Sequence, residues 1–155
     1  MRSRIVRASI LAAALLALLG GSPGDARAQA ADGVSAADSA AIRQAALDYI
    51  EGYYTGDAER MRRALHPGLV KRIVRVQEGQ PRLGEMTAQQ LIDGTAAGWG
   101  REVPEHARRT DVTILDAFRN VAAVRVDAHD WIDYMQIARW NGEWKIVNVL
   151  WETRQ

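Results

Sequence analysis

The sequence predicts an α+β protein in which three N-terminal helices pack on one face of a curved antiparallel sheet. Three observations support this fold class. Apolar residues recur at helical spacing over residues 42–53, β-branched and aromatic runs succeed one another over residues 111–152, and Asn141-Gly142 separates the last two of these runs. This order, with the helices first and a long meander of strands last, is typical of an α+β domain.

The first predicted helix begins at Ser35-Ala-Ala-Asp38, where the serine and the aspartate can form a capping box. The apolar residues that follow repeat every three or four positions, which places them on one helix face. They are Ile42, Ala46, Tyr49, Ile50 and Tyr53. Tyr54-Thr-Gly56 ends this long amphipathic helix.

Two shorter helices and one pair of strands are predicted next. A helix opens at Gly56-Asp57 and stops at His66-Pro67, because the residue before a proline avoids the α region. Residues 69–77 are β-branched and predict a strand, and residues 82–85 predict its short return strand. The capping box Thr87-Ala-Gln-Gln90 then predicts the third helix.

Residues 111–118 and 121–129 predict two more strands around Arg119-Asn120. Alternation places small or apolar side chains on one face of this pair: Thr113, Leu115, Ala117, Ala122, Val124 and Val126. Asp116 and Arg125 fall on the opposite face, among Val112 and Ile114. A two-residue turn would set Asp116 opposite Ala123 and Ile114 opposite Arg125.

The C-terminal hairpin is the strongest local signal, because Asn and Gly tolerate the positive φ angles of a type I′ turn. A two-residue loop pairs Trp140 with Glu143, Arg139 with Trp144 and Ile137 with Ile146. One face then carries Trp131, Met135, Ile137, Trp144, Ile146 and Leu150, and the other Ile132, Tyr134, Ala138, Trp140, Val147, Val149 and Trp151. Neither face is polar, so both must be covered. We therefore expect a homodimer through the outer sheet face.

Residues 1–30 are predicted to be a signal peptide, 31–35 a linker and 36–155 the folded domain. Arg2, Arg4 and Arg7 precede a short apolar run, and Ala28-Gln29-Ala30 is a small-x-small cleavage site. Cleavage after Ala30 is preferred over cleavage after Ala28, and the apolar run is too short for a membrane span. We expect a periplasmic or secreted protein that has no membrane attachment after processing.

Composition narrows the functional classes. Loss of residues 1–30 removes four arginines and one aspartate, which changes the formal net charge from +1 to −2. No basic stripe with interleaved aromatic residues remains, so nucleic acid is not an expected partner. Cysteine is absent, which excludes disulfides and thiolate chemistry. The motifs of serine hydrolases, zincins and phosphate-binding loops are also missing.

Several motifs together resemble the putative lumazine-binding family of the nuclear-transport-factor-two-like, or steroid-isomerase-like, superfamily. They are the helix junction Asp48-Tyr-Ile-Glu-Gly-Tyr-Tyr-Thr-Gly-Asp57, Ala64-Leu-His-Pro67, Met86-Thr87, Ile114-Leu-Asp116, Asp133-Tyr134 and Asn141-Gly-Glu-Trp-Lys-Ile-Val-Asn148. The resemblance covers residues 36–152. It implies a cone in which a bent sheet wraps the first helix and leaves a cavity at its open end. Because the superfamily holds both enzymes and binders, the fold alone does not assign a function.

Four residues are candidate ligand contacts at the mouth of this cone: Tyr49, Tyr53, His66 and Trp99. Tyr53, His66 and Trp99 end the elements that surround the opening, and would offer two flat surfaces and one titratable group. The alternatives are that His66 faces the helix dipole and that the tyrosines pack in the core.

Other polar residues are assigned no chemistry. Asp116 and Arg125 are interpreted as an outer-face ion pair, and His129, Asp130 and Asp133 as turn residues rather than a metal site. Trp144 is expected in the core, and Trp140 and Trp151 at the interface. We expect no metal, no cofactor and no assigned catalytic residue.

The leading hypothesis is an exported protein that binds an apolar or aromatic small molecule in its cone. The alternative is an isomerase-, cyclase- or hydrolase-like enzyme that uses Asp, His or Tyr in the cavity. A third hypothesis is an accessory role with the cavity filled by side chains.

Overall fold

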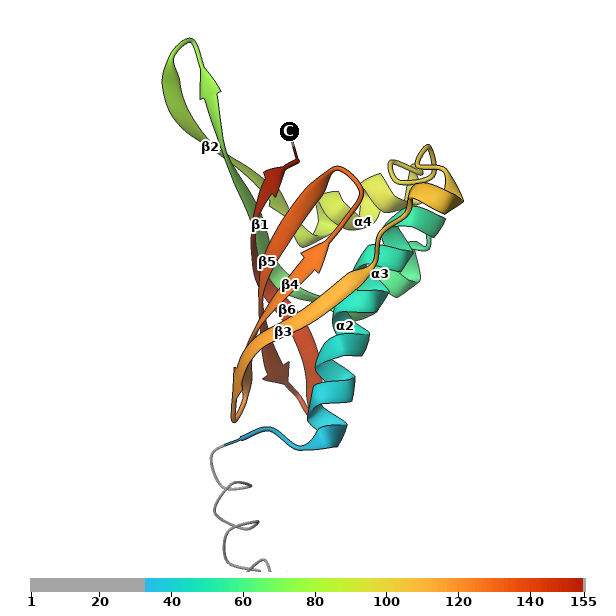
Figure 1. Cartoon of the computed structure of the whole chain (residues 1–155), viewed down its shortest axis with the longest axis vertical. Coiled ribbons are helices and arrows are strands. Elements are labelled where there is room, and N and C mark those ends of the chain that lie inside the picture. The colour runs from blue at the N-terminus through green and yellow to red at the C-terminus, as the bar shows by residue number, and fades with distance from the viewer. Residues whose placement is uncertain (1–32, 155) are drawn as a thin grey trace, which may run out of the picture.

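The computed structural model describes residues 33–154 and shows helices packed on one side of a curved six-stranded sheet (Figure 1). The elements are α2 (Ala36–Thr55), α3 (Ala58–Ala64), β1 (Leu65–Gln77), β2 (Gln80–Thr87), α4 (Ala88–Ala96), the 3-10 turn η1 (Glu105–Ala107), β3 (Asp111–Phe118), β4 (Val121–Asp127), β5 (Trp131–Trp140) and β6 (Glu143–Thr153). The predicted α+β fold class is confirmed. The predicted signal peptide and the first two residues of the predicted linker lie outside the described residues.

The sheet order is β2-β1-β6-β5-β4-β3. The chain makes the β1–β2 hairpin at one edge, crosses through α4 and a loop to β3 at the other edge, and returns strand by strand. The last strand, β6, therefore lies beside β1, and these two strands are parallel whereas the other neighbours are antiparallel. The sheet is mixed rather than purely antiparallel.

The predicted caps set the helix starts. The Ser35 hydroxyl accepts a hydrogen bond from the Asp38 N–H at 3.0 Å, and Gly56 ends α2 at φ 70°. Thr87 and Gln90 form the expected reciprocal capping box of α4. Asp38 also holds α2 to the sheet, because its carboxylate accepts from the Trp144 indole at 3.1 Å and pairs with Arg139.

The hairpin between β5 and β6 has its predicted register near the turn, with Asn141 at φ 50° and Gly142 at φ 84°. A bulge at Val147 then shifts the register: Ile137 pairs with Ile146, whereas Gln136 pairs with Asn148. The bulge adds one residue to β6, so every side chain beyond it changes face. The face predictions for Val149, Leu150 and Trp151 were therefore wrong.

A second bulge has the same consequence at the other edge of the sheet. Asp116 faces Ala123, as predicted, but Ile114 faces Val124 rather than Arg125, since Leu115 is the extra residue. Val112 is consequently buried and Leu115 exposed, the reverse of the predicted pattern. Arg125 pairs with Asp127, at 2.7 Å, and not with Asp116.

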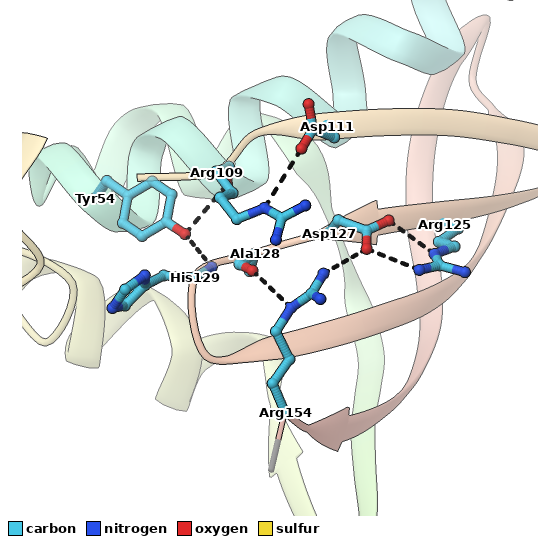
Figure 2. Close-up of polar contacts among 8 residues, drawn as sticks. All are labelled: Tyr54, Arg109, Asp111, Arg125, Asp127, Ala128, His129 and Arg154. Atoms are coloured by element: carbon cyan, nitrogen blue, oxygen red, sulfur yellow. Dashed lines mark hydrogen bonds and ion pairs between the residues drawn. The ribbon is translucent and has the colours of Figure 1, made fainter. Parts of the chain in front are cut away.

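The corner between β4 and β5 is held by the polar network of Figure 2. The Tyr54 hydroxyl accepts from the His129 N–H at 2.9 Å and donates to the Arg109 carbonyl oxygen at 3.2 Å. Asp127 pairs with both Arg125 and Arg154. These contacts satisfy backbone groups where the strand direction reverses, so the corner has a structural explanation.

The core fills the space between α2 and the concave face of the sheet. Fully buried side chains come from both layers: Ile42, Ala46, Tyr49, Ile50, Met61, Val124, Val126, Met135, Ile137, Ile146 and Val149. Trp144 is buried among them, as predicted. The core covers most of the inner face, and the remaining inner surface lies where α4 approaches β1 and β2.

Candidate functional site

A cavity of about 90 Å³ lies between α2, α4 and the inner face of the sheet. Its lining is largely aromatic: Tyr49, Tyr53, Lys71, Met86, Leu91, Trp99, Trp131 and Trp151. The two tyrosines come from α2, Leu91 from α4, and Lys71, Met86, Trp131 and Trp151 from four different strands. Only Lys71 brings a formal charge to this wall.

Lys71 forms a buried ion pair with Asp133. The Lys71 Nζ lies 2.6 Å from the Asp133 Oδ1, and the two side chains are 4% and 0% exposed. The second carboxylate oxygen of Asp133 accepts from the Trp131 indole at 2.7 Å. The Lys71 Nζ also donates to the Tyr49 hydroxyl at 2.6 Å. Two of the three ammonium hydrogens thus have acceptors among the described residues.

Strand register brings these groups together. Lys71 on β1 pairs with Val149 on β6, and Asp133 on β5 pairs with Trp151 on the same β6 strand. Lys71, Trp151 and Asp133 are therefore neighbours across three adjacent strands on the inner face. The bulge at Val147 is what brings Trp151 onto this face.

Aromatic rings surround the ammonium group. The Lys71 Nζ lies 4.7 Å from the ring centroid of Trp151 and 5.3 Å from those of Trp131 and Tyr49. Trp131 also packs edge-on against Tyr53 at 5.3 Å and Trp151 at 6.4 Å. Because ring faces attract a cation, the rings partly replace the water that Lys71 loses on burial.

Burial shifts the titration of both donors. Desolvation lowers the pKa of Lys71, and the charge of Asp133 opposes this only in part. Desolvation, followed by the negative charge of Asp133, raises the pKa of Tyr49 well above its ordinary value. Tyr49 is therefore a neutral phenol at physiological pH and can both donate and accept a hydrogen bond.

Trp99 forms the outer wall of the cavity and is 53% exposed. Its ring rests on Gly94, where an added methyl group would lie 2.2 Å from the indole. An open hollow of about 400 Å³ lies on the solvent side of Trp99 and Met86, and a further one of about 150 Å³ adjoins Lys71 and Trp151. The cavity shares Met86 and Trp99 with the first hollow, and Lys71, Met86 and Trp151 with the second.

Three of the four predicted contacts meet in this cavity: Tyr49, Tyr53 and Trp99. His66 does not, so the prediction that it would join them was wrong. Its ring packs edge-on against Trp140 at 4.6 Å, and its Nδ1 accepts from the Gly68 N–H at 3.0 Å. Helix α3 ends at Ala64 and His66 already belongs to β1, which carries it away from the opening.

Sequence reasoning missed Lys71, Trp131 and Trp151 as cavity residues, and it missed Asp133 as the buried partner of Lys71. Asp133 was read as a turn residue and Trp151 as an interface residue, whereas both point inward. One signal was available: Lys71 is one of only two lysines in a chain rich in arginine, and it interrupts a β-branched run.

Among residues 33–154, no three potential metal-ligating side chains come together. Nor does that part of the chain contain a helix long and apolar enough to cross a membrane.

Comparison with known proteins identifies the fold. The model of a family described as "Putative lumazine-binding" matches residues 37–152. An NTF2-like protein of unknown function from Shewanella baltica OS155 is 21% identical, with a TM-score of 0.62 over 79% of this chain and 98% of that one. A second, from Methylobacillus flagellatus KT, is 20% identical, with a TM-score of 0.62 over 79% and 96%. No curated protein matches.

Proposed function

We propose that this chain, which belongs to the putative lumazine-binding family, binds a flat, largely apolar or aromatic small molecule in the cavity around Lys71. The observation that carries the proposal is the wall itself: aromatic side chains surround one buried charged pair. Apolar walls with a few fixed polar groups are typical of small-molecule sites.

The polar end of the ligand is an acceptor. Lys71 has a third N–H, and the buried indole N–H of Trp151 has no hydrogen-bond partner among the described residues. Buried donors are nearly always satisfied, and each one left unpaired costs about 1–3 kcal/mol. An oxygen of the ligand placed beside Lys71 would satisfy such a donor.

Movement of Trp99 would make room for a ring-sized ligand. The inner cavity of about 90 Å³ is smaller than the roughly 150 Å³ cavity that holds benzene in an engineered protein, so a ring-sized ligand must displace a wall residue. Trp99 is exposed and borders the larger outer hollow, so its movement would join the two volumes. The indole would then stack on the ligand that it admits.

The binding experiment uses two tryptophans of equal exposure. Thermal-shift screening of a pterin, a flavin and a steroid is carried out on the wild type, Trp99→Ala and Trp140→Ala. Trp99 and Trp140 are 53% and 52% exposed, but only Trp99 lines the cavity. We expect Trp99→Ala to raise the Kd of a bound compound about tenfold, which is about 1.4 kcal/mol of binding free energy, and Trp140→Ala to leave the Kd unchanged. Equal binding by all three proteins would show that the compound does not contact Trp99 at the cavity opening.

An enzymatic role is the alternative. Among the described residues, the Tyr49–Lys71–Asp133 contacts are the arrangement that best supports it. A phenol, an amine and a carboxylate in hydrogen-bond contact can relay a proton to or from a bound molecule. Conversion of a ligand by the wild type that is lost in Asp133→Asn, with binding retained, would support catalysis.

We also propose export, with the mature chain starting at Ala31. The basic start, the short apolar run and Ala28-Gln29-Ala30 support this proposal. Intact-mass analysis of the protein in its own host should find residues 31–155 outside the cytoplasm. A membrane-bound chain that retains Met1 would contradict it.

A further inference from the structure

We infer that Lys71 is a covalent attachment point for an aldehyde or ketone ligand, which it holds as a protonated imine. The inference rests on the proposed function, because the carbonyl compound must enter the same cavity. It adds the chemical class of the ligand and the bond that holds it.

The amine is placed for this reaction. Lys71 lines both the inner cavity and the hollow of about 150 Å³ beside it, so space lies next to its ammonium group. Arginine at this position could pair with Asp133 equally well but cannot form an imine. The chain contains only two lysines, and one of them occupies this buried position.

Asp133 provides the proton path. At 2.6 Å the carboxylate can take a proton from the Lys71 ammonium, which leaves a neutral amine and a neutral acid in a site that disfavours charge. The amine lone pair then forms a bond to the carbonyl carbon, and the carbonyl oxygen takes the proton back from Asp133. Tyr49, a neutral phenol in contact with Nζ, can donate a hydrogen bond to that oxygen.

Loss of water completes the step without an oxidant or a reductant. The ammonium group and the carbonyl compound give a protonated imine and one water molecule, in which two former ammonium hydrogens leave with the oxygen. The third hydrogen stays on nitrogen, and Asp133 is again a carboxylate. One positive charge therefore sits at Nζ before and after the reaction, facing the same counter-ion.

The surrounding rings suit the protonated imine as well as the ammonium group. Trp151, Trp131 and Tyr49 lie 4.7–5.3 Å from Nζ and can stabilise an iminium cation as they stabilise the ammonium. Burial at 4% exposure keeps bulk water, which would hydrolyse the imine, away from it.

Lys145 is a matched internal control. It is the second lysine, it pairs with Glu143 at 2.8 Å and donates to the Arg63 carbonyl oxygen at 2.7 Å. It lies on the opposite face of the sheet from Lys71, next to the hairpin turn, and does not line the cavity. Any preference for Lys71 over Lys145 therefore reports the cavity rather than amine chemistry in general.

The experiment treats the mature protein with benzaldehyde and sodium cyanoborohydride at neutral pH and locates benzyl adducts by peptide mass spectrometry. We expect Lys71 to be modified several-fold faster than Lys145 in the folded protein, because only Lys71 lines the cavity and has the Asp133 carboxylate at 2.6 Å to take its proton. The preference should vanish in guanidinium chloride. Asp133→Asn, checked for folding by circular dichroism, should lose it too.

Benzyl alcohol separates failure of the inference from failure of the proposed function. It has the same ring but no carbonyl, so it should compete for the cavity and slow the adduct at Lys71. A thermal shift with benzyl alcohol and no preference for Lys71 in the folded wild type would overturn the covalent step and leave binding intact. No shift and no adduct would overturn both.

Discussion

At the residue scale, the Lys71–Asp133 pair is the most informative feature of the molecule. Two charges that are 4% and 0% exposed gain little net stability, because desolvation offsets their attraction. A hydrophobic pair of similar volume would often hold a fold equally well. Because Lys71 lines the cavity and Asp133 is its buried partner, the pair favours a role in ligand recognition over a role in stability.

The first prediction compares single and paired replacement. Lys71→Met leaves Asp133 buried without its counter-charge and should cost about 3–5 kcal/mol in the free energy of unfolding. Lys71→Met with Asp133→Leu should recover most of this loss, while Lys145→Met should cost at most about 1 kcal/mol. Urea unfolding measures all three. Equal stability of the single and paired variants would show that the pair is not a coupled buried unit.

A second residue-scale prediction concerns acid stability. The hydrogen bonds from Arg125 and then Arg154 hold the pKa of Asp127 below its ordinary value of 3.8. A lowered pKa in the folded state stabilises the fold above pH 3.8, and this contribution is lost as pH falls through the folded-state pKa. Asp127→Asn should therefore be less stable at pH 7 and lose less stability between about pH 4 and 2. Parallel pH profiles of the two proteins would exclude this contribution.

At the element scale, the bulge at Val147 decides which residues form the cavity. It turns Val149 and Trp151 inward and Leu150 outward. Without it, Leu150 would point into the core and the third aromatic ring around Lys71 would be missing. The cavity therefore depends on one inserted residue in the last strand.

Neighbouring substitutions test this register. Val149 is 0% exposed and Leu150 is 51% exposed. Val149→Glu should unfold the domain, because an unpaired carboxylate would enter the core, whereas Leu150→Glu should keep the native circular dichroism spectrum. The reverse outcome would support a β6 strand without the bulge, in the register that simple alternation predicts.

The same element shows how far the sequence could predict the structure. Caps, helix periodicity and the Asn-Gly turn are local, so the helices and hairpins could be predicted from neighbouring residues. Whether a strand bulges is decided by packing across the sheet, which the alternation around Val147 does not reveal. Lys71 was missed for a related reason: its burial depends on Asp133, which lies 62 residues away in the chain.

At the scale of the whole molecule, the outer face of the sheet remains apolar. Tyr134, Leu150, Val121 and Phe118 are each about half exposed, and a hollow of about 440 Å³ lies over β3 to β6. Exposed apolar surface of this kind is typical of an interface. We propose that a second copy of the chain covers it in a two-fold dimer.

Sedimentation should therefore find a dimer at micromolar concentration, and Tyr134→Glu should convert it to a folded monomer. Tyr134 and Leu150 are paired on adjacent strands of this face, so a charge on either would be buried at the interface. Arg62→Glu, on the exposed side of α3 in the helix layer, serves as the control for added negative charge. A monomeric wild type would contradict the dimer.

The central claim is that the cavity around Lys71 holds a small molecule, and native mass spectrometry of the protein purified from its own host tests it most directly. The account predicts a wild-type species that carries one additional small-molecule mass per chain. This mass should be absent from the variant with Lys71→Met and Asp133→Leu, which we expect to stay folded and which circular dichroism checks. A wild-type protein with no additional mass, or a mass that persists in that variant, would contradict the assignment of this cavity as the binding site.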